Sequence, residues 1–316
     1  MATVSIPLPN FETVDAVSYF SSMISYNPKD WFTFIFRFHK ADTVRILFPM
    51  ILAMCAYSGL VAFLELEVWK LSKDNYVRNL TLLHNLLGFV LSLLLVFRTN
   101  SAYDRWWEGR KLWGSLVNNS RNMAMKLNAY LSIDDTTTRQ QAARLITSYA
   151  HTLKKHLRGE QVTFELDQQE HPELASINNN HHVPNQVAAL LAKKINRLYK
   201  EGKISGEQLL ALNPELMSFA DICGACERIK NTPIPYSYSA FVKKFIFFYV
   251  MTLPFGFVFS LGYYVIPVVA FVFYVLASLE LIAEEIEDPF DGDDNDVPTQ
   301  KIAEGITRHV NEILLG

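Results

Sequence analysis

Residues Leu80 to Phe97 read LTLLHNLLGFVLSLLLVF and contain no Asp, Glu, Lys or Arg. A helix of about 20 mostly apolar residues is long enough to cross the hydrocarbon core of a bilayer. The alternative is a helix buried in a soluble core, but uninterrupted runs of this length are rare there. The stretch therefore predicts a transmembrane helix.

Three further apolar runs accompany it, at Val44–Leu64, Phe245–Leu261 and Tyr263–Ala283. The last two are separated by little more than Gly262, which predicts a tight helical hairpin. The runs thus form two pairs on either side of a long polar middle. We predict an all-α membrane protein with four transmembrane helices per subunit and a helical cytosolic region.

Basic residues gather before the first run, after the second and before the third. Because Lys and Arg favour the cytoplasmic side, both termini and the middle are expected in the cytoplasm of a multi-pass cell-membrane protein. Five segments follow from this: a cytosolic N-terminal segment (1–43), a first helix pair (44–97), a cytosolic helical domain (98–240), a second helix pair (241–283), and an acidic segment with a C-terminal helix (284–316).

Composition excludes several classes of protein. The chain has 29 Lys and Arg against 32 Asp and Glu, a net charge of −3, which argues against a nucleic-acid partner. Three cysteines do not suggest a secreted disulfide scaffold. The first ten residues lack the pattern of a cleavable signal peptide. No nucleophile–base pair or phosphate loop is apparent, so we expect no enzyme activity and no required cofactor.

The polar middle has the periodicity of helices, with no strand of consequence. Asp134 and Asp135 are candidate N-caps for one of them. Helices are expected at Asn100–Tyr130, Thr136–Leu157, Gln186–Lys200, Ser205–Ala211, Asn213–Lys230 and Gln300–Leu315. Between Arg98 and Arg110, charged and aromatic side chains form a dense block, which indicates ion pairs that hold a helix at the membrane boundary.

Phe89, Leu93 and Phe97 recur every four residues and therefore share one face of the second apolar run. From spacing alone, lipid contact or packing is the favoured interpretation, since any apolar helix supplies such residues. His84 and Asn85 lie near the start of the same run. Either could line an outer vestibule or form a hydrogen bond to a neighbouring helix.

Three stretches are similar to the bestrophin family of ion channels, and more to its bacterial branch. They are GFVLSLLLVFRTNSAYDRWWEGRKLWG (Gly88–Gly114), CERIKNTPIPYSY (Cys226–Tyr238) and AEEIEDPFDGDDND (Ala283–Asp296). The resemblance implies a homopentamer with a pore on its five-fold axis, lined by the second membrane helix. Phe89, Leu93 and Phe97 match the family's pore neck, where apolar rings gate conduction by excluding water.

The resemblance also implies a second constriction, the cytosolic aperture, near Glu207 and Gln208. A channel of this family passively conducts small monovalent ions, here expected to be chloride or other anions. A sodium-selective cation channel of the same fold is the alternative, because an acidic ring favours cations. The expected partners are further copies of the chain, membrane lipid and the permeant ions.

The acidic segment matches positions at which animal bestrophins hold calcium, a hard cation that carboxylates suit. The residues are Glu285, Asp288, Asp293 and Asp296. An EF-hand loop does not fit, because Asp296 and Ile302 stand where its glycine and final glutamate belong. The alternative is an acidic helix end followed by a solvated loop.

Cys223 and Cys226 form a C-x-x-C pair, a weak signal for redox or zinc chemistry. Zinc needs about four ligands, and His181 and His182 are the clustered candidates to complete such a site. A membrane redox or zinc protein is therefore the rival from another class, and a membrane scaffold without ion flux is a third possibility. The favoured interpretation is that both cysteines pack inside a buried helix.

Overall fold

The computed structural model describes residues 43–70, 80–160 and 177–316, and every element in these ranges is helical. The elements are α2 (Thr43–Phe63), the π-helical turn η1 (Leu64–Val68), α3 (Leu80–Tyr130), α4 (Thr136–Leu157), α5 (Val183–Lys200), α6 (Gly206–Asn231), α7 (Tyr236–Leu261), the 3-10 turn η4 (Gly262–Tyr264), α8 (Val265–Glu287) and α9 (Thr299–Leu315). The predicted N-terminal segment, apart from Thr43, lies outside the described residues, as do residues 71–79 of the predicted first helix pair and residues 161–176 of the predicted cytosolic domain.

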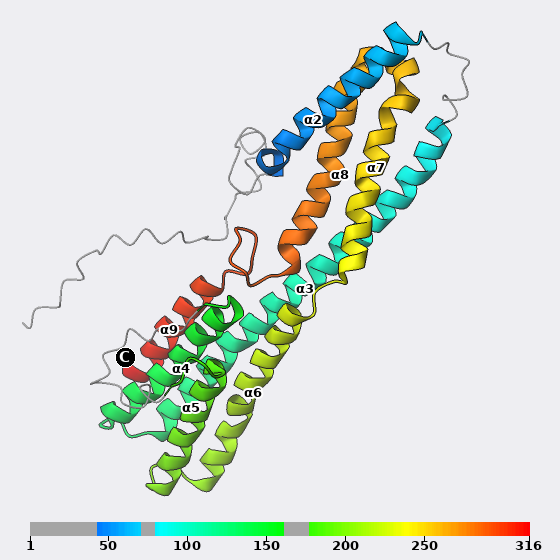
Figure 1. Cartoon of the computed structure of the whole chain (residues 1–316). Coiled ribbons are helices and arrows are strands. Elements are labelled where there is room, and N and C mark those ends of the chain that lie inside the picture. Colours follow the sequence, from blue (N-terminus) through cyan, green and yellow to red (C-terminus); the bar gives the residue numbers. More distant parts are fainter. Residues whose placement is uncertain (1–42, 71–79, 161–176) are drawn as a thin grey trace, which may run out of the picture.

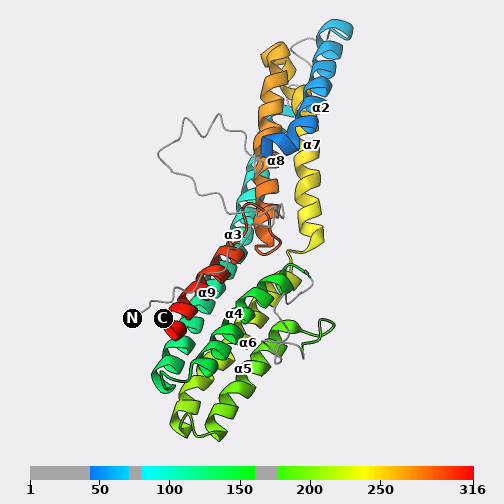
Figure 2. The same cartoon turned by 90° about the vertical axis from the view of Figure 1, so that its left-hand side faces the viewer.

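The helices form two bundles along one axis. Helices α2, α7 and α8 lie together at one end, as both views show (Figures 1 and 2). At the other end α4, α6 and α9 pack on α3, and α5 packs on α4 and α6. Each bundle has its own apolar core. One core includes Leu91, Leu95 and Val250, and the other includes Trp113 and Phe219.

Helix α3 joins the two bundles and is continuous over 51 residues (Figure 1). The separate helices predicted at Leu80–Phe97 and Asn100–Tyr130 are thus one element. No proline or glycine interrupts the junction at Arg98 and Thr99, so only the surroundings change there, not the helix. At 1.5 Å per residue, α3 is roughly 75 Å long and can carry one face from the apolar bundle deep into the polar one.

The predicted hairpin near Gly262 is confirmed. Gly262 has φ +56°, a conformation that glycine adopts without steric cost, and it turns the chain from α7 into α8. In the described residues, three helical stretches are long and apolar enough to cross a membrane: Thr43–Val68, Thr81–Tyr130 and Tyr236–Glu287. The third contains the Gly262 turn and both arms of the hairpin, which lie side by side in the two views (Figures 1 and 2).

Local signals explain several helix starts in the second bundle. The carboxylate of Asp135 accepts a hydrogen bond from the Thr138 amide and caps α4, as predicted for this pair of aspartates. The predicted break between Ala211 and Asn213 is wrong, because α6 continues through Pro214. Buried side chains such as Phe219 anchor α6 against its neighbours, which compensates for the amide hydrogen bond that proline cannot donate.

Candidate pore helix and metal-ligating cluster

One face of α3 packs inside the apolar bundle. Leu91 and Leu95 are buried there, and both belong to the same apolar cluster as Val250 of α7 and Val269 of α8. Further down the same face, Ala102 is fully buried. This side of α3 therefore packs against other helices of the same chain.

The opposite face of α3 carries Phe89, Leu93 and Phe97. Leu93 is two residues from both Leu91 and Leu95, which places it roughly half a turn away from the packed face. The three side chains are 68%, 47% and 57% exposed. Exposure of large apolar side chains to water is unfavourable. Those on a helix face without contacts in the chain are therefore expected to face lipid, a further subunit or a dry pore.

The same open face becomes polar after Phe97. Asn100, Asp104, Lys111 and Asn118 follow it at helical spacing, and all four are exposed. One continuous face is thus apolar in the first bundle and polar in the second. Such a face can border a dry constriction above and a water-filled passage below.

Helix α3 approaches α7 closely at two points near its start. A Cβ at Gly88 would lie 2.7 Å from the hydroxyl oxygen of Tyr249, so only glycine fits without displacing that ring. The ring nitrogen Nε2 of His84 lies 3.0 Å from Oγ1 of Thr252, and His84 is buried. Of the two roles considered for His84, the structure shows the contact with a neighbouring helix, whereas Asn85 is exposed.

The charged block after Phe97 ties α3 to the rest of the chain, as predicted. Arg98 is 1% exposed, with Nη2 at 2.7 Å from Oε2 of Glu287 and Nε at 3.4 Å from Oε1 of Glu280. Arg105 donates to the carbonyl oxygens of Glu287, Ile229 and Thr232. These contacts fix the end of α6 and helix α8 onto α3.

The two residues predicted at the cytosolic aperture occupy the first turn of α6, at the end of the molecule far from the apolar bundle (Figure 1). Glu207 is exposed, and a hydrogen bond from the Ser205 hydroxyl lowers the pKa of its carboxyl. Gln208 forms a capping box with Ser205, since Gln208 Oε1 accepts from the Ser205 amide. The S-x-x-Q pattern could have identified this local role.

The acidic segment after α8 folds back on itself. Asp296 is buried and accepts from the amides of Gly292 and Asp293, while Glu285 accepts from the side chain of Asn295. Asp288 accepts from the amide of Phe290. In the part of the chain that the structure describes, these carboxylates do not form a group of three with converging oxygens. The calcium site stays a prediction.

Cys223 and Cys226 are buried in α6. Burial, reinforced by the nearby charge of Glu227, raises the pKa of the Cys223 thiol to about 12, and burial likewise raises the pKa of Cys226. Within residues 43–70, 80–160 and 177–316, the one group of three or more potential metal ligands contains neither cysteine. This fits the predicted packing role.

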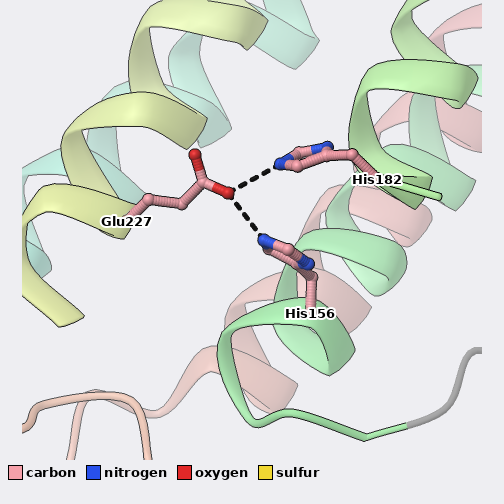
Figure 3. Close-up of side chains that lie close together, drawn as sticks. All are labelled: His156, His182 and Glu227. Atoms are coloured by element: carbon pink, nitrogen blue, oxygen red, sulfur yellow. Dashed lines mark hydrogen bonds and ion pairs between the residues drawn. The ribbon is translucent and has the colours of Figure 1, made fainter. Parts of the chain in front are cut away.

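That group consists of His156, His182 and Glu227, whose ligand atoms lie within 4.8 Å of one another (Figure 3). His182 was a sequence candidate, but its neighbour His181 is not a member. Sequence reasoning missed His156 and Glu227, because no local spacing links residues of three different helices.

The long two-faced helix, the apolar hairpin and the buried ion pairs at their junction define a helical membrane protein built around one extended helix. The chain matches the family model of bacterial and fungal bestrophin proteins over residues 23–312. It belongs to the bestrophin family, as the sequence resemblance predicted. The family is one of channel-forming proteins.

Two curated relatives are voltage-dependent anion channel-forming proteins. That of Nostoc sp. is 33% identical over 90% of this chain and 92% of its own. That of Synechocystis sp. is 29% identical over 94% of this chain and 96% of its own. The crystal structure of a bacterial bestrophin homolog from Klebsiella pneumoniae superposes with a TM-score of 0.73 at 25% identity, covering 84% of this chain and 97% of that one.

Proposed function

We propose that this chain forms a homopentameric channel that passively conducts small monovalent anions such as chloride. In this proposal, Phe89, Leu93 and Phe97 of five subunits form the hydrophobic neck. The single observation that carries it is the open face of α3, where these three side chains lie opposite the packed face and remain exposed. The anion-channel function of the relatives supports the same conclusion.

The proposed pore has two constrictions, the neck on α3 within the first bundle and the aperture at the first turn of α6. Five copies of the neck residues would create a short dry barrier, which ions cross only when it widens or wets. Glu207 and Gln208 would surround the cytosolic aperture. A ring of carboxylates at Glu207 favours cations, so a sodium-selective pore of the same fold is the second candidate.

Current recordings from reconstituted bilayers test the neck. Replacing Phe89, Leu93 and Phe97 together by Ala is expected to raise conductance or remove gating, because the dry barrier is lost. Phe271→Ala is the matched control, since Phe271 is 65% exposed on α8, outside the proposed pore. Unchanged currents in the triple variant would rule out this neck.

Reversal potentials under asymmetric NaCl decide the sign of the permeant ion. For an anion channel, the current reverses near the chloride equilibrium potential. A reversal near the sodium equilibrium potential would instead support the cation-selective candidate. The mass of the protein in detergent tests whether it is a pentamer.

Absence of current with every ion tested would favour a membrane scaffold without ion flux.

Both termini are proposed to lie in the cytoplasm, with four spans per subunit. The burial of Cys223 and Cys226, which raises the pKa of both thiols, argues against the rival redox or zinc protein based on them. Calcium binding at the acidic segment is kept as a proposal that calcium titration of the purified channel can test.

A further inference from the structure

Three helices bring two imidazoles and one carboxylate to a single point in the second bundle. His156 lies in the last turn of α4, His182 caps the start of α5, and Glu227 lies on α6. Nε2 of each histidine is 2.6 Å from the same oxygen, Oε1 of Glu227 (Figure 3). The two rings are 4.4 Å apart between centroids.

The three side chains are partly exposed to water, and other contacts hold their helices in place. The side chains of His156, His182 and Glu227 are 31%, 31% and 29% exposed, so a hydrated ion can reach them. The helices that carry them are held independently of the cluster. Tyr149 of α4, for example, packs its ring on Phe219 of α6 at 4.7 Å between centroids.

The donor set is that of a transition-metal site. Two imidazole nitrogens and a carboxylate oxygen suit Zn²⁺ and its neighbours, whereas calcium and magnesium prefer oxygen donors alone. Three protein ligands leave at least one position of a tetrahedral ion for water. The ligand atoms need to separate only slightly to admit an ion, since they already lie within 4.8 Å of one another.

We propose that His156, His182 and Glu227 bind one divalent transition-metal ion per chain, with Zn²⁺ as the representative ion. The site is distinct from the proposed neck, the aperture and the acidic segment, and it does not use Cys223 or Cys226. The ion would cross-link α4, α5 and α6. The proposal does not depend on which ion the pore conducts.

The cap of α5 opposes this binding. Nδ1 of His182 accepts a hydrogen bond from the Asn185 amide at 3.1 Å, so in the neutral ring the proton is on Nε2 and is donated to Glu227. A metal on Nε2 takes the place of that proton, and Nδ1 then carries it. Loading therefore competes with the helix cap, which lowers the affinity below that of a closed structural site.

Calorimetric titration of the full chain in detergent, first stripped with a chelator, tests the site with ZnCl2. We expect one zinc per chain. His156→Ala, His182→Asn and Glu227→Gln should each weaken binding at least about tenfold, since even changes beside a metal ligand have this effect. His182→Asn is the sharpest variant, because asparagine can still cap α5 but supplies no Nε2.

The matched control is His181→Ala, which removes the adjacent exposed histidine and should leave zinc affinity unchanged. Co²⁺ gives a second readout, because its visible absorption reports the coordination geometry and should be lost in His182→Asn. Circular dichroism and elution volume verify that each variant folds. Absence of zinc binding in the native chain would overturn the proposal, as would undiminished binding in the three variants or equal loss in His181→Ala.

Discussion

Nη2 of Arg98 lies 2.7 Å from Oε2 of Glu287, and the arginine side chain is almost completely buried. The other carboxylate oxygen of Glu287 accepts from the Ile234 amide at 2.6 Å, so one side chain joins α3, the end of α8 and the linker before α7. Glu287→Gln keeps an acceptor for Ile234 but removes the charge. We expect it to lower the free energy of unfolding by about 3 kcal/mol, because Arg98 loses a buried partner.

The control for this ion pair is the exposed pair of Lys243 and Glu284, whose charged atoms are also 2.7 Å apart. Both side chains are about half exposed, so Glu284→Gln should cost about 0–1 kcal/mol. Chemical unfolding in detergent, followed by circular dichroism, measures both variants. Equal losses would show that burial of the Arg98 pair adds nothing.

Gly109 of α3 provides the surface on which the loop after α8 docks. A Cβ there would lie 3.0 Å from Cζ of Phe290 and 3.2 Å from Cγ of Pro289, and Phe290 is buried. Gly109→Ala should therefore destabilise the chain by about 1 kcal/mol through overpacking, despite the better helix propensity of alanine. Unfolding measurements test this, and a Phe290→Ala background should relieve the loss.

Gly305 of α9 is the matched control for Gly109. No atom lies within 4 Å of a Cβ built at Gly305, so Gly305→Ala should stabilise the chain by about 0.4–1 kcal/mol. The two Gly→Ala changes thus have opposite expected signs. The docking account of Gly109 fails if both variants gain stability.

The apolar runs were predictable because length and lack of charge are local properties of the sequence. The hairpin at Gly262 and the cap at Asp135 were likewise predictable, since both depend on a single residue type at a single position. The continuity of α3 was not predictable in this way. The change from apolar to polar at Arg98 marks a boundary between surroundings, and it was mistaken for the end of a helix.

The sites depend on contacts between distant residues, which limits what local patterns reveal. The spacing of Phe89, Leu93 and Phe97 identified a stripe, but only the packing of Leu91 and Leu95 shows that this stripe is the open one. His156 and Glu227 are 71 residues apart, and neither has a local feature that sets it apart. Only the packing of three helices joins them.

The buried cysteines are expected to react slowly. Thiolates are the reactive form, and burial holds the pKa of Cys223 at about 12 and raises that of Cys226. In a Cys55→Ala background, a maleimide at pH 8 should label the folded chain far more slowly than the denatured chain. Replacing both cysteines by Ala should leave ion currents and zinc affinity intact. Rapid labelling, or metal lost with the thiols, would restore the redox or zinc alternative.

Asp296 makes the acidic loop sensitive to pH. Burial raises the pKa of its carboxyl to about 7, from an ordinary value of 3.8, and the charges of Asp293 and Asp288 act in the same direction. Between about pH 4 and pH 7 the folded chain therefore holds a proton that the unfolded chain has lost. Stability should fall as the pH rises through this range and level off above it.

Asp296→Asn mimics the protonated carboxyl and keeps an oxygen for the amides of Gly292 and Asp293. Its stability should therefore fall less between pH 5 and pH 7.5 than that of the native chain, so the variant gains relative stability at the higher pH. Thermal unfolding in detergent across this range measures the difference. Asp291→Asn removes an exposed charge from the same loop and should keep the native slope. If both variants follow the native pH profile, the proton does not reside on Asp296.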